Sequence, residues 1–257
     1  MNYNYIINSP LEQFEINSFL GINLPLIGYL QFSLTNFGFY SILTIISIIM
    51  FLWMTNLNNK ILINPWSFSS ETIYQTIHNM VRIQIGGKLG EYYFPFIFSI
   101  FTFILFANLI SLIPYSFAIT SHMVLALTFS LSILIGVTIL GFNLHGLKYF
   151  SIIVPAGAPV ALLPLLILLE FISYFAKGIS HGLRLAINLL AGHCLMIIIC
   201  GFIFNFMISG FTQFILSPIA ISALVAIYLL EFGIAFIQAY VFSLLASSYI
   251  NDSIKLH

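Results

Sequence analysis

Residues 160–208 read VALLPLLILLEFISYFAKGISHGLRLAINLLAGHCLMIIICGFIFNFMI, an apolar block much longer than one membrane crossing requires. A crossing takes about 20 apolar residues, whereas a continuous helix over 162–203 would be roughly 60 Å long, twice the thickness of the hydrocarbon core. Such a helix must tilt steeply, kink or break into two spans. Residues 212–250 form a second long apolar block. The two blocks predict a long, tilted helical hairpin over 160–252.

Three shorter runs before this hairpin also predict membrane helices. They contain no charged residue and cover 36–55, 92–113 and 123–144, the last two forming a hairpin over 92–144. Residues 66–87 differ, because Ile73, Ile77 and Met80 recur at helical spacing among polar residues. With Ser69 or Ser70 as its N-cap, this segment is interpreted as an amphipathic helix on the membrane surface or as a short solvated loop helix.

The whole chain is therefore predicted to be one all-α integral membrane domain over 1–257. It has about five transmembrane helices plus the surface amphipathic helix, and the last two helices are long and steeply tilted. The N-terminal segment 1–35 carries acidic residues but no Lys or Arg, whereas 56–91 and 145–158 are basic. By the positive-inside rule, the two basic segments face the matrix or cytoplasm, and residues 1–35 and 114–121 face the opposite side.

Composition supports a membrane protein and excludes several other classes. Hydrophobic residues make up 61% of the 257 residues and charged residues 5%, too few to cover a soluble globule. The net charge of zero argues against a nucleic-acid partner. Cys194 and Cys200, six residues apart, would lie about 9 Å apart along a helix, too far for a disulfide. No metal, no cofactor and no classical targeting peptide is predicted, and the richness in Phe and Tyr hints at an organellar genome.

Titratable and polar side chains are concentrated in the two long blocks, where each charge costs about 2.5–3.5 kcal/mol on insertion scales. In the first block, spacings of 7, 4, 3 and 4 place five of them on one helix face: Glu170, Lys177, His181, Arg184 and Asn188. In the second block, multiples of seven place three on one stripe: Glu231, Gln238 and Asp252. Matching polar faces predict an aqueous or proton-conducting seam, or a seam against another subunit.

Arg184 lies well inside an apolar run, and its guanidinium cannot lose its proton. One interpretation is structural: Arg184 snorkels toward the membrane interface or pairs with Glu231 as an internal staple. The other is a permanent positive charge opposite a carboxylate that moves. In that case Glu170 lies about 21 Å away along the helix on one side, and His193 about 13 Å away on the other, within reach of Glu231. This layout is typical of two proton paths separated by a charge barrier.

Other polar residues are assigned structural positions. Lys177 and His181 are expected at a solvated inner rim, and His122 and His145 at the membrane interface. Asn108, in a Phe-rich helix, is expected to pack against another helix.

Several stretches resemble subunit a of F-type ATP synthases, with the closest likeness to fungal mitochondrial members. They are SPLEQFE at 9–15, ANLISLIPYSF at 107–117, VPAG at 154–157, GLRLAIN at 182–188, AGH at 191–193, and Glu231 with QAY at 238–240. The resemblance implies a non-catalytic, proton-translocating stator subunit of the mitochondrial inner membrane. Its implied partners are a rotating ring of c subunits, other membrane-sector and peripheral-stalk subunits, and the lipid bilayer. Relatives often lose a short leader, which here would end near Asn8.

The resemblance also implies how the ring meets this chain. Arg184 would face the carboxylate of a ring subunit, Asn188 would be its polar neighbour, and Gln238 would lie near Arg184. A proton from outside would neutralise a ring carboxylate beside Arg184, and the carboxylate would release it inward after nearly a full turn of the ring.

Two half-channels are implied as well. His193 and Glu231 would belong to the one open to the intermembrane space, with Asp252 as a companion. Glu170 would belong to the half-channel open to the matrix.

Two other classes also place charges inside a membrane. A proton-coupled secondary transporter or respiratory-complex subunit is one, although such folds often carry internal repeats and none is visible here. A haem-binding cytochrome is the other, but His181 and His193 lie twelve residues apart on one predicted helix and cannot bind one iron from opposite sides.

Overall fold

The computed structural model describes residues 12–23, 31–56, 65–113, 116–152 and 162–255. These form six long helices: α1 (Asn36–Asn56), α2 (Pro65–Gln84), α3 (Gly87–Ser111), α4 (Met123–His145), α5 (Leu163–Ser209) and α6 (Phe211–Ile254). Short 3-10 turns occupy η1 (Glu12–Phe14), η3 (Ile119–Ser121) and η4 (Gly146–Ile152). In the described part of the chain, five of these helices are long and apolar enough to cross a membrane. The exception is α2. The predicted fold class is confirmed.

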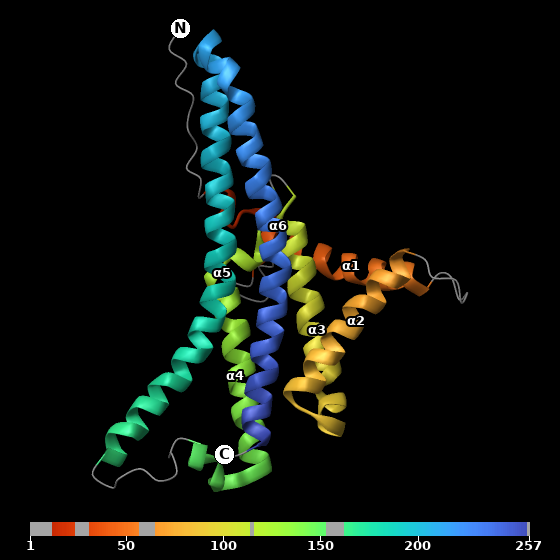
Figure 1. The fold of residues 1–257 in the computed structure, drawn as a ribbon, viewed down its shortest axis with the longest axis vertical. Coiled ribbons are helices and arrows are strands. Elements are labelled where there is room, and N and C mark those ends of the chain that lie inside the picture. Colours follow the sequence, from red (N-terminus) through yellow and green to blue (C-terminus); the bar gives the residue numbers. More distant parts are fainter. Residues whose placement is uncertain (1–11, 24–30, 57–64, 114–115, 153–161, 256–257) are drawn as a thin grey trace.

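The two long blocks form the predicted helical hairpin. Each is one continuous helix, and only Gly210 separates α5 from α6, at φ 154° and ψ 170°. This backbone conformation is essentially restricted to glycine, which explains how so sharp a reversal is made by one residue. Figure 1 shows α6 running beside the C-terminal part of α5, while the N-terminal part of α5 bends away from it. The angle of the hairpin to a membrane stays a prediction.

The boundaries of α2 differ from the prediction. The helix begins at Pro65 rather than near Ser69, because proline is well suited to the first helical position. Ser69 and Ser70 therefore lie inside the helix, where their hydroxyls donate to the carbonyl oxygens of Trp66 and Ser67, and the predicted N-cap is wrong.

The amphipathic pattern of α2 is present, but its apolar face is covered by protein. Ile77, Met80 and Val81 are buried, and α2 packs against α3. Its two predicted settings, on the membrane surface or in a solvated loop, therefore stay untested. α3 begins at Gly87, before the predicted residue 92, and Gly86, at φ 83°, separates it from the end of α2.

The N-terminal segment contains a structure that the sequence did not predict. β1 (Ser18–Asn23) pairs antiparallel with β2 (Gln31–Thr35). Asn36 then ties this segment to the start of α1, because its Nδ2 donates to the carbonyl oxygen of Glu15 at 2.8 Å and its Oδ1 accepts from the backbone N–H of Asn17 at 3.2 Å. The predicted leader end near Asn8 and the VPAG stretch at 154–157 lie outside the described residues.

Close backbone contacts hold α5 against α4. A Cβ added at Gly182 would lie 2.7 Å from the carbonyl oxygen of Ala126 and 2.6 Å from Oγ of Ser130, both in α4. Oγ of Ser130 also donates to the carbonyl oxygen of Gly178 at 2.9 Å. Small residues let membrane helices approach in this way, so the region around Arg184 is supported from behind by α4.

The basic segments meet at one end of the molecule. Nζ of Lys255 lies 3.9 Å from the Cβ position of Gly86, between α2 and α3. At the end of α4, Nε2 of His145 lies 3.1 Å from the carbonyl oxygen of Ile254. The ends of α2, α4 and α6 are therefore together, as the charge pattern predicts, and we call this the basic end.

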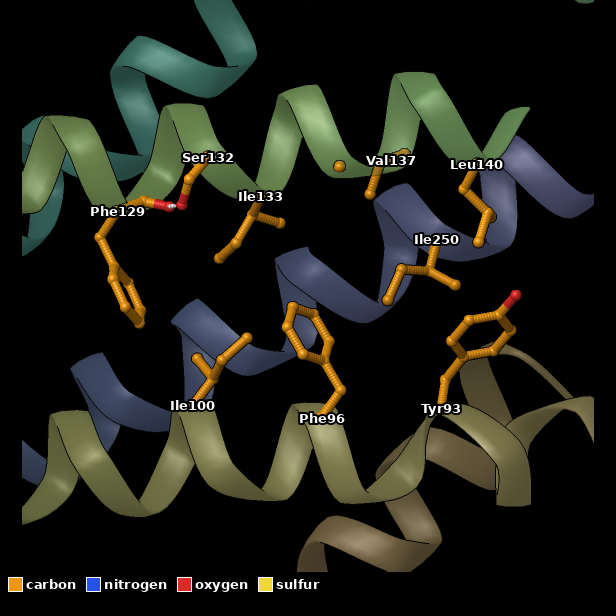
Figure 2. Close-up of a pocket in the computed structure, with 10 residues that line it drawn as sticks. Tyr93, Phe96, Ile100, Phe129, Ser132, Ile133, Val137, Leu140 and Ile250 are labelled. Carbon is orange, nitrogen blue, oxygen red and sulfur yellow. Dashed lines mark hydrogen bonds between the residues drawn. The ribbon is translucent and has the colours of Figure 1, made fainter. Parts of the chain in front are cut away.

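An apolar pocket of about 370 Å³ lies between α3, α4 and α6. Figure 2 shows Phe96, Phe129 and Ile250 facing into it, with the hydroxyl of Tyr93 at one end. No acidic or basic side chain is among the described residues that line it, so the candidate site lies elsewhere.

Candidate functional site

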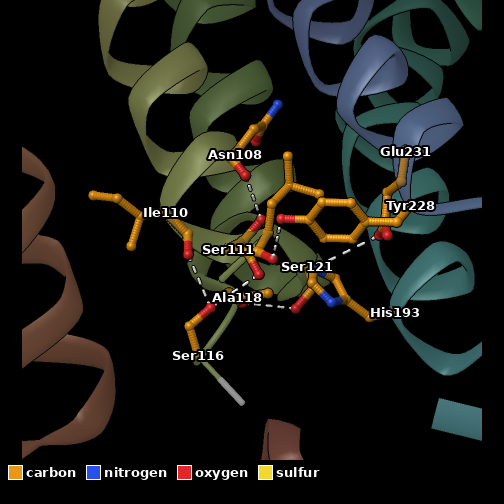
Figure 3. Close-up of polar contacts among 10 residues, drawn as sticks. Asn108, Ile110, Ser111, Ser116, Ala118, Ser121, His193, Tyr228 and Glu231 are labelled. Atoms are coloured by element: carbon orange, nitrogen blue, oxygen red, sulfur yellow. Dashed lines mark hydrogen bonds and ion pairs between the residues drawn. The ribbon is translucent and has the colours of Figure 1, made fainter. Parts of the chain in front are cut away.

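The first element of the site is a pair of titratable side chains from α5 and α6. Nε2 of His193 lies 3.9 Å from Oε1 of Glu231, and the two side chains are only 8% and 3% exposed. Figure 3 shows them pointing toward each other across the two helices. The predicted meeting of His193 and Glu231 is confirmed.

The same pair tests the predicted staple between Arg184 and Glu231. Neither carboxylate oxygen of Glu231 accepts a hydrogen bond from any residue that the structure describes. Arg184 is also exposed on α5 rather than buried against α6. The internal staple between Arg184 and Glu231 is therefore wrong.

Gly192 makes room for the carboxylate. A Cβ at this position would lie 2.7 Å from Oε1 and 3.1 Å from Cδ of Glu231. The carboxyl group thus rests directly on the backbone of α5, next to His193. The distance between the two titratable groups depends on the absence of a side chain at 192.

We expect Gly192→Ala to separate Glu231 from His193 with little loss of stability, because the added methyl meets the end of a flexible side chain rather than backbone. Proton flux should fall by about tenfold, which corresponds to about 1.4 kcal/mol in the barrier to proton transfer. The measurement is the proton flux through the assembled protein in liposomes. Gly233→Ala is the matched control, since a Cβ there has no atom within 4 Å. Equal activity of the two variants would contradict this prediction.

A cleft of about 650 Å³ lies beside this pair, and we call it the outer cleft. It is lined by residues of α5 and α6, including His193, Cys200 and Tyr228, and by Gln13 and Ser116. Oη of Tyr228 donates to the carbonyl oxygen of Leu112 at 3.3 Å, which joins α6 to the end of α3. The outer cleft gives His193 a route to the side of the molecule away from the basic end.

A second, smaller pocket of about 40 Å³ lies toward the basic end, and we call it the inner pocket. Two carboxylates and one ammonium line it, Glu170 and Lys177 from α5 and Asp252 from α6. Three phenols line it as well, Tyr149, Tyr174 and Tyr249. The concentration of titratable groups is suited to accepting and releasing protons.

Arg184 lies between the outer cleft and the inner pocket. Along α5, it is seven residues from Lys177 and nine from His193, or about 10 Å and 13 Å. Arg184 and Asn188 are both exposed, whereas Leu185 and Ala186 are buried on the other side of the helix. The fixed positive charge therefore faces outward, at mid-length between two sets of titratable groups.

Two sequence-based positions need correction. Asp252 was expected beside His193 and Glu231, but it lines the inner pocket with Glu170, because it follows Glu231 by 21 positions and so lies toward the other end of α6. His181 was expected at a solvated rim, but it is only 4% exposed. Its position on α5 turns it toward α6 rather than outward.

The remaining polar residues have different outcomes. Asn108 is fully buried, and its Nδ2 donates to the carbonyl oxygen of Ala235 in α6 at 3.3 Å, so it packs helices together as expected. Gln238 is 9% exposed on α6, and its predicted place near Arg184 stays a prediction. His122 is half-buried between aromatic rings at the start of α4, where desolvation lowers its pKa, and its place at the membrane interface stays a prediction.

Sequence reasoning missed the tyrosines of the inner pocket and the contribution of the N-terminal segment. Tyr174 lies four residues after Glu170 and three before Lys177, so it continues the stripe that was counted from charged residues alone. Tyr249 lies three residues before Asp252 and was detectable in the same way. Gln13 had no such signal, because it reaches the outer cleft through tertiary structure.

In the described ranges, no group of three His, Cys, Asp or Glu side chains is arranged to hold a metal ion. The chemistry available to this site is proton transfer between carboxylates, imidazoles and phenols around one guanidinium.

Comparison with known proteins gives consistent matches. The profile of the family described as ATP synthase A chain matches residues 38–251. ATP synthase subunit a of Wickerhamomyces canadensis is 51% identical over 254 residues, covering 99% of each chain. The protein of the same name from Trichophyton rubrum is 49% identical over 257 residues, covering 100% of each chain. That from Saccharomyces cerevisiae is 46% identical over 254 residues, covering 99% of this chain and 98% of its own.

Proposed function

Because this chain belongs to the ATP synthase A chain family, we propose that it carries protons through two offset half-channels that meet a rotating ring of c subunits. The observation that supports this most directly is the placement of Arg184 between the outer cleft and the inner pocket. One continuous pore would let protons leak. Two part-channels with a fixed cation between them require a carrier, and a ring of moving carboxylates is such a carrier.

The outer cleft is the uptake side in this proposal. A proton reaches His193 and Glu231, which lie 3.9 Å apart and exchange protons between imidazole and carboxyl group. From there it neutralises a ring carboxylate beside Arg184. The neutral ring subunit then turns into lipid, where an ionised carboxylate would be costly.

The inner pocket is the release side. After nearly a full turn, a protonated ring carboxyl group meets the inner half-channel and gives its proton to the groups around Glu170 and Asp252. Arg184 favours the ionised form of the ring carboxylate at this point and blocks direct passage between the half-channels. Asn188, one turn further along the exposed face, and Gln238 on α6 assist as polar neighbours.

The chain itself catalyses no reaction in this proposal, and rotation drives ATP formation elsewhere in the complex. Its setting is the mitochondrial inner membrane, with the basic end toward the matrix. Further partners are other membrane-sector and peripheral-stalk subunits. Family membership decides against the alternatives of a secondary transporter, a respiratory-complex subunit and a haem protein.

Cross-linking to the ring tests the proposal directly. With Cys194 and Cys200 replaced by alanine, Asn188→Cys should form an oxidant-dependent disulfide with a cysteine introduced next to the ring carboxylate, because position 188 is exposed on the Arg184 face. Ile45→Cys on α1 is the control, as its side chain is 51% exposed but lies on a different helix. The measurement is the covalent product after assembly of the complex. A cross-link from position 45 but not from 188 would contradict the proposed ring contact.

A further inference from the structure

We propose that His181 is a further proton-relay residue, which passes protons between the Arg184 face and the inner pocket. The inference rests on the proposed function. It assigns a role in that function to a residue for which the sequence predicted only a position at a solvated rim.

His181 is buried in a way that packing alone does not explain. Its side chain is 4% exposed, and neither ring nitrogen has a hydrogen-bond partner among the residues that the structure describes. Its ring lies edge-on to Phe242, with 3.8 Å between the centroids. A buried polar group without a partner is unfavourable by about 1–3 kcal/mol. An apolar side chain would fill this position at lower cost, so the imidazole calls for a functional explanation.

Tyr249 connects His181 to the inner pocket. The centroids of the two rings are 5.8 Å apart, and Tyr249 also lines the inner pocket together with Glu170 and Asp252. Oη of Tyr249 donates to the carbonyl oxygen of Lys177, one helical turn before His181. His181 therefore touches a residue that belongs to the release side.

On the other side, His181 lies three residues before Arg184, about 4.5 Å along α5. No other titratable side chain stands between these two positions on the helix. The spacing of 4, 3, 4 and 3 residues makes one continuous column on α5: Glu170, Tyr174, Lys177, His181 and Arg184.

The groups around His181 come from three elements. Tyr249 on α6 contacts it directly, and Lys177 and Arg184 lie one turn away on α5; beyond Tyr249, the inner pocket adds Tyr174 on α5, Asp252 on α6 and Tyr149 on η4. Behind Gly178 and Gly182, the nearest residues of α4 are Ala126, Ser130 and Leu134, none of which is titratable. The column therefore has proton donors and acceptors toward the basic end and a fixed cation at its other end.

Imidazole is suited to this position because a neutral ring has one donor and one acceptor nitrogen. The acceptor nitrogen takes the proton that a ring carboxylic acid gives up beside Arg184, leaving that carboxylate ionised. The other nitrogen then gives its proton to a carboxylate of the inner pocket. The imidazole returns to its neutral form, so charge and protons balance after each transfer.

Chemical rescue tests the relay. His181→Ala in the assembled complex should lower proton flux in liposomes by about 100-fold, the lower end of what a positioned proton-transfer group contributes. Added imidazole should restore a large part of this flux, because it can occupy the space left by the side chain and titrate there. Pyrazole has the same size but is not protonated near neutral pH, and it should restore nothing. Rescue should also follow the pH on the matrix side rather than on the outer side.

His122→Ala is the control, since His122 is a half-buried histidine among aromatic rings that lies at the start of α4, away from the column. In His122→Ala, added imidazole should not increase the proton flux. Unchanged flux in His181→Ala, or equal rescue by imidazole and pyrazole, would overturn the relay. The Arg184→Lys variant is measured in parallel. If Arg184→Lys is inactive while His181→Ala is normal, the relay alone fails, whereas activity in both would refute the proposed function.

Discussion

Arg184→Lys is expected to abolish proton-driven ATP synthesis while the complex still assembles. Assembly should survive because Arg184 is exposed, and the buried residues next to it, Leu185 and Ala186, are unchanged. Function should be lost because a lysine ammonium is a compact charge that can give up its proton in an apolar seam, whereas a guanidinium stays charged and offers a planar set of donors. The measurement is ATP synthesis by the reconstituted complex under an imposed proton gradient.

Arg82→Lys is the matched control, because it changes the only other arginine of the chain, which lies exposed in the last turn of α2. It should retain synthesis. Arg184→Ala should have a larger effect than Arg184→Lys. It should also allow passive proton leak, because the barrier between the outer cleft and the inner pocket loses its charge. Near-normal synthesis with lysine at 184 would show that the residue is not the barrier.

Glu231→Gln is expected to reduce proton-driven synthesis by about 100-fold, since an amide of similar shape cannot take up and release a proton. The change should not disturb packing, because the side chain keeps its size against Gly192 and its position 3.9 Å from His193. The measurement is the rate of ATP synthesis against the outer pH, with the amount of assembled complex determined on the same samples.

Glu91→Gln serves as the control for Glu231→Gln. Glu91 is an exposed carboxylate near the start of α3, and its replacement should leave synthesis unchanged. If Glu231→Gln also retained its full rate, Glu231 would be removed from the proton path. Loss of rate together with loss of assembled complex would instead assign Glu231 a structural role.

The large features of this fold were predictable because they depend on simple quantities. The length of the apolar block at 160–208 indicated a helix too long for one upright crossing, and the structure has an uninterrupted helix there. The contact between His193 and Glu231 was predictable because the two long helices run in opposite directions, so that counting residues along each gives the level at which their side chains meet. Such arguments hold because rise per residue is nearly constant in a helix.

Local details were less predictable. The start of α2 was misjudged because Ser69 and Ser70 resemble caps, whereas Pro65 sets the first turn. The strands β1 and β2 were not predicted, because their pairing depends on contacts with each other and with Asn36. Cap and turn residues act within a few positions, so several choices compete within one short segment.

Positions around the site depended on rotation about the helix axis as well as on distance along it. Counting charges placed His181 and Arg184 on one face, yet one is buried and the other exposed, because a face defined by three- and four-residue steps is broad. Asp252 shares a heptad stripe with Glu231, but 21 residues of continuous helix put about 32 Å between them, so the resemblance rather than the spacing misplaced it. Tertiary structure decided only the burial of His181.

The glycines on the covered side of α5 have a mechanical consequence. In the proposed mechanism, a ring that is driven past Arg184 and Asn188 pushes sideways on α5, and an equal reaction torque must be carried by whatever lies behind it. Gly178 and Gly182 bring α4 into close contact there. Contacts through backbone and short side chains, as at Gly182, have few soft degrees of freedom, and close-packed interiors have low compressibility. Load applied on the exposed face is therefore transmitted to α4 with little elastic loss.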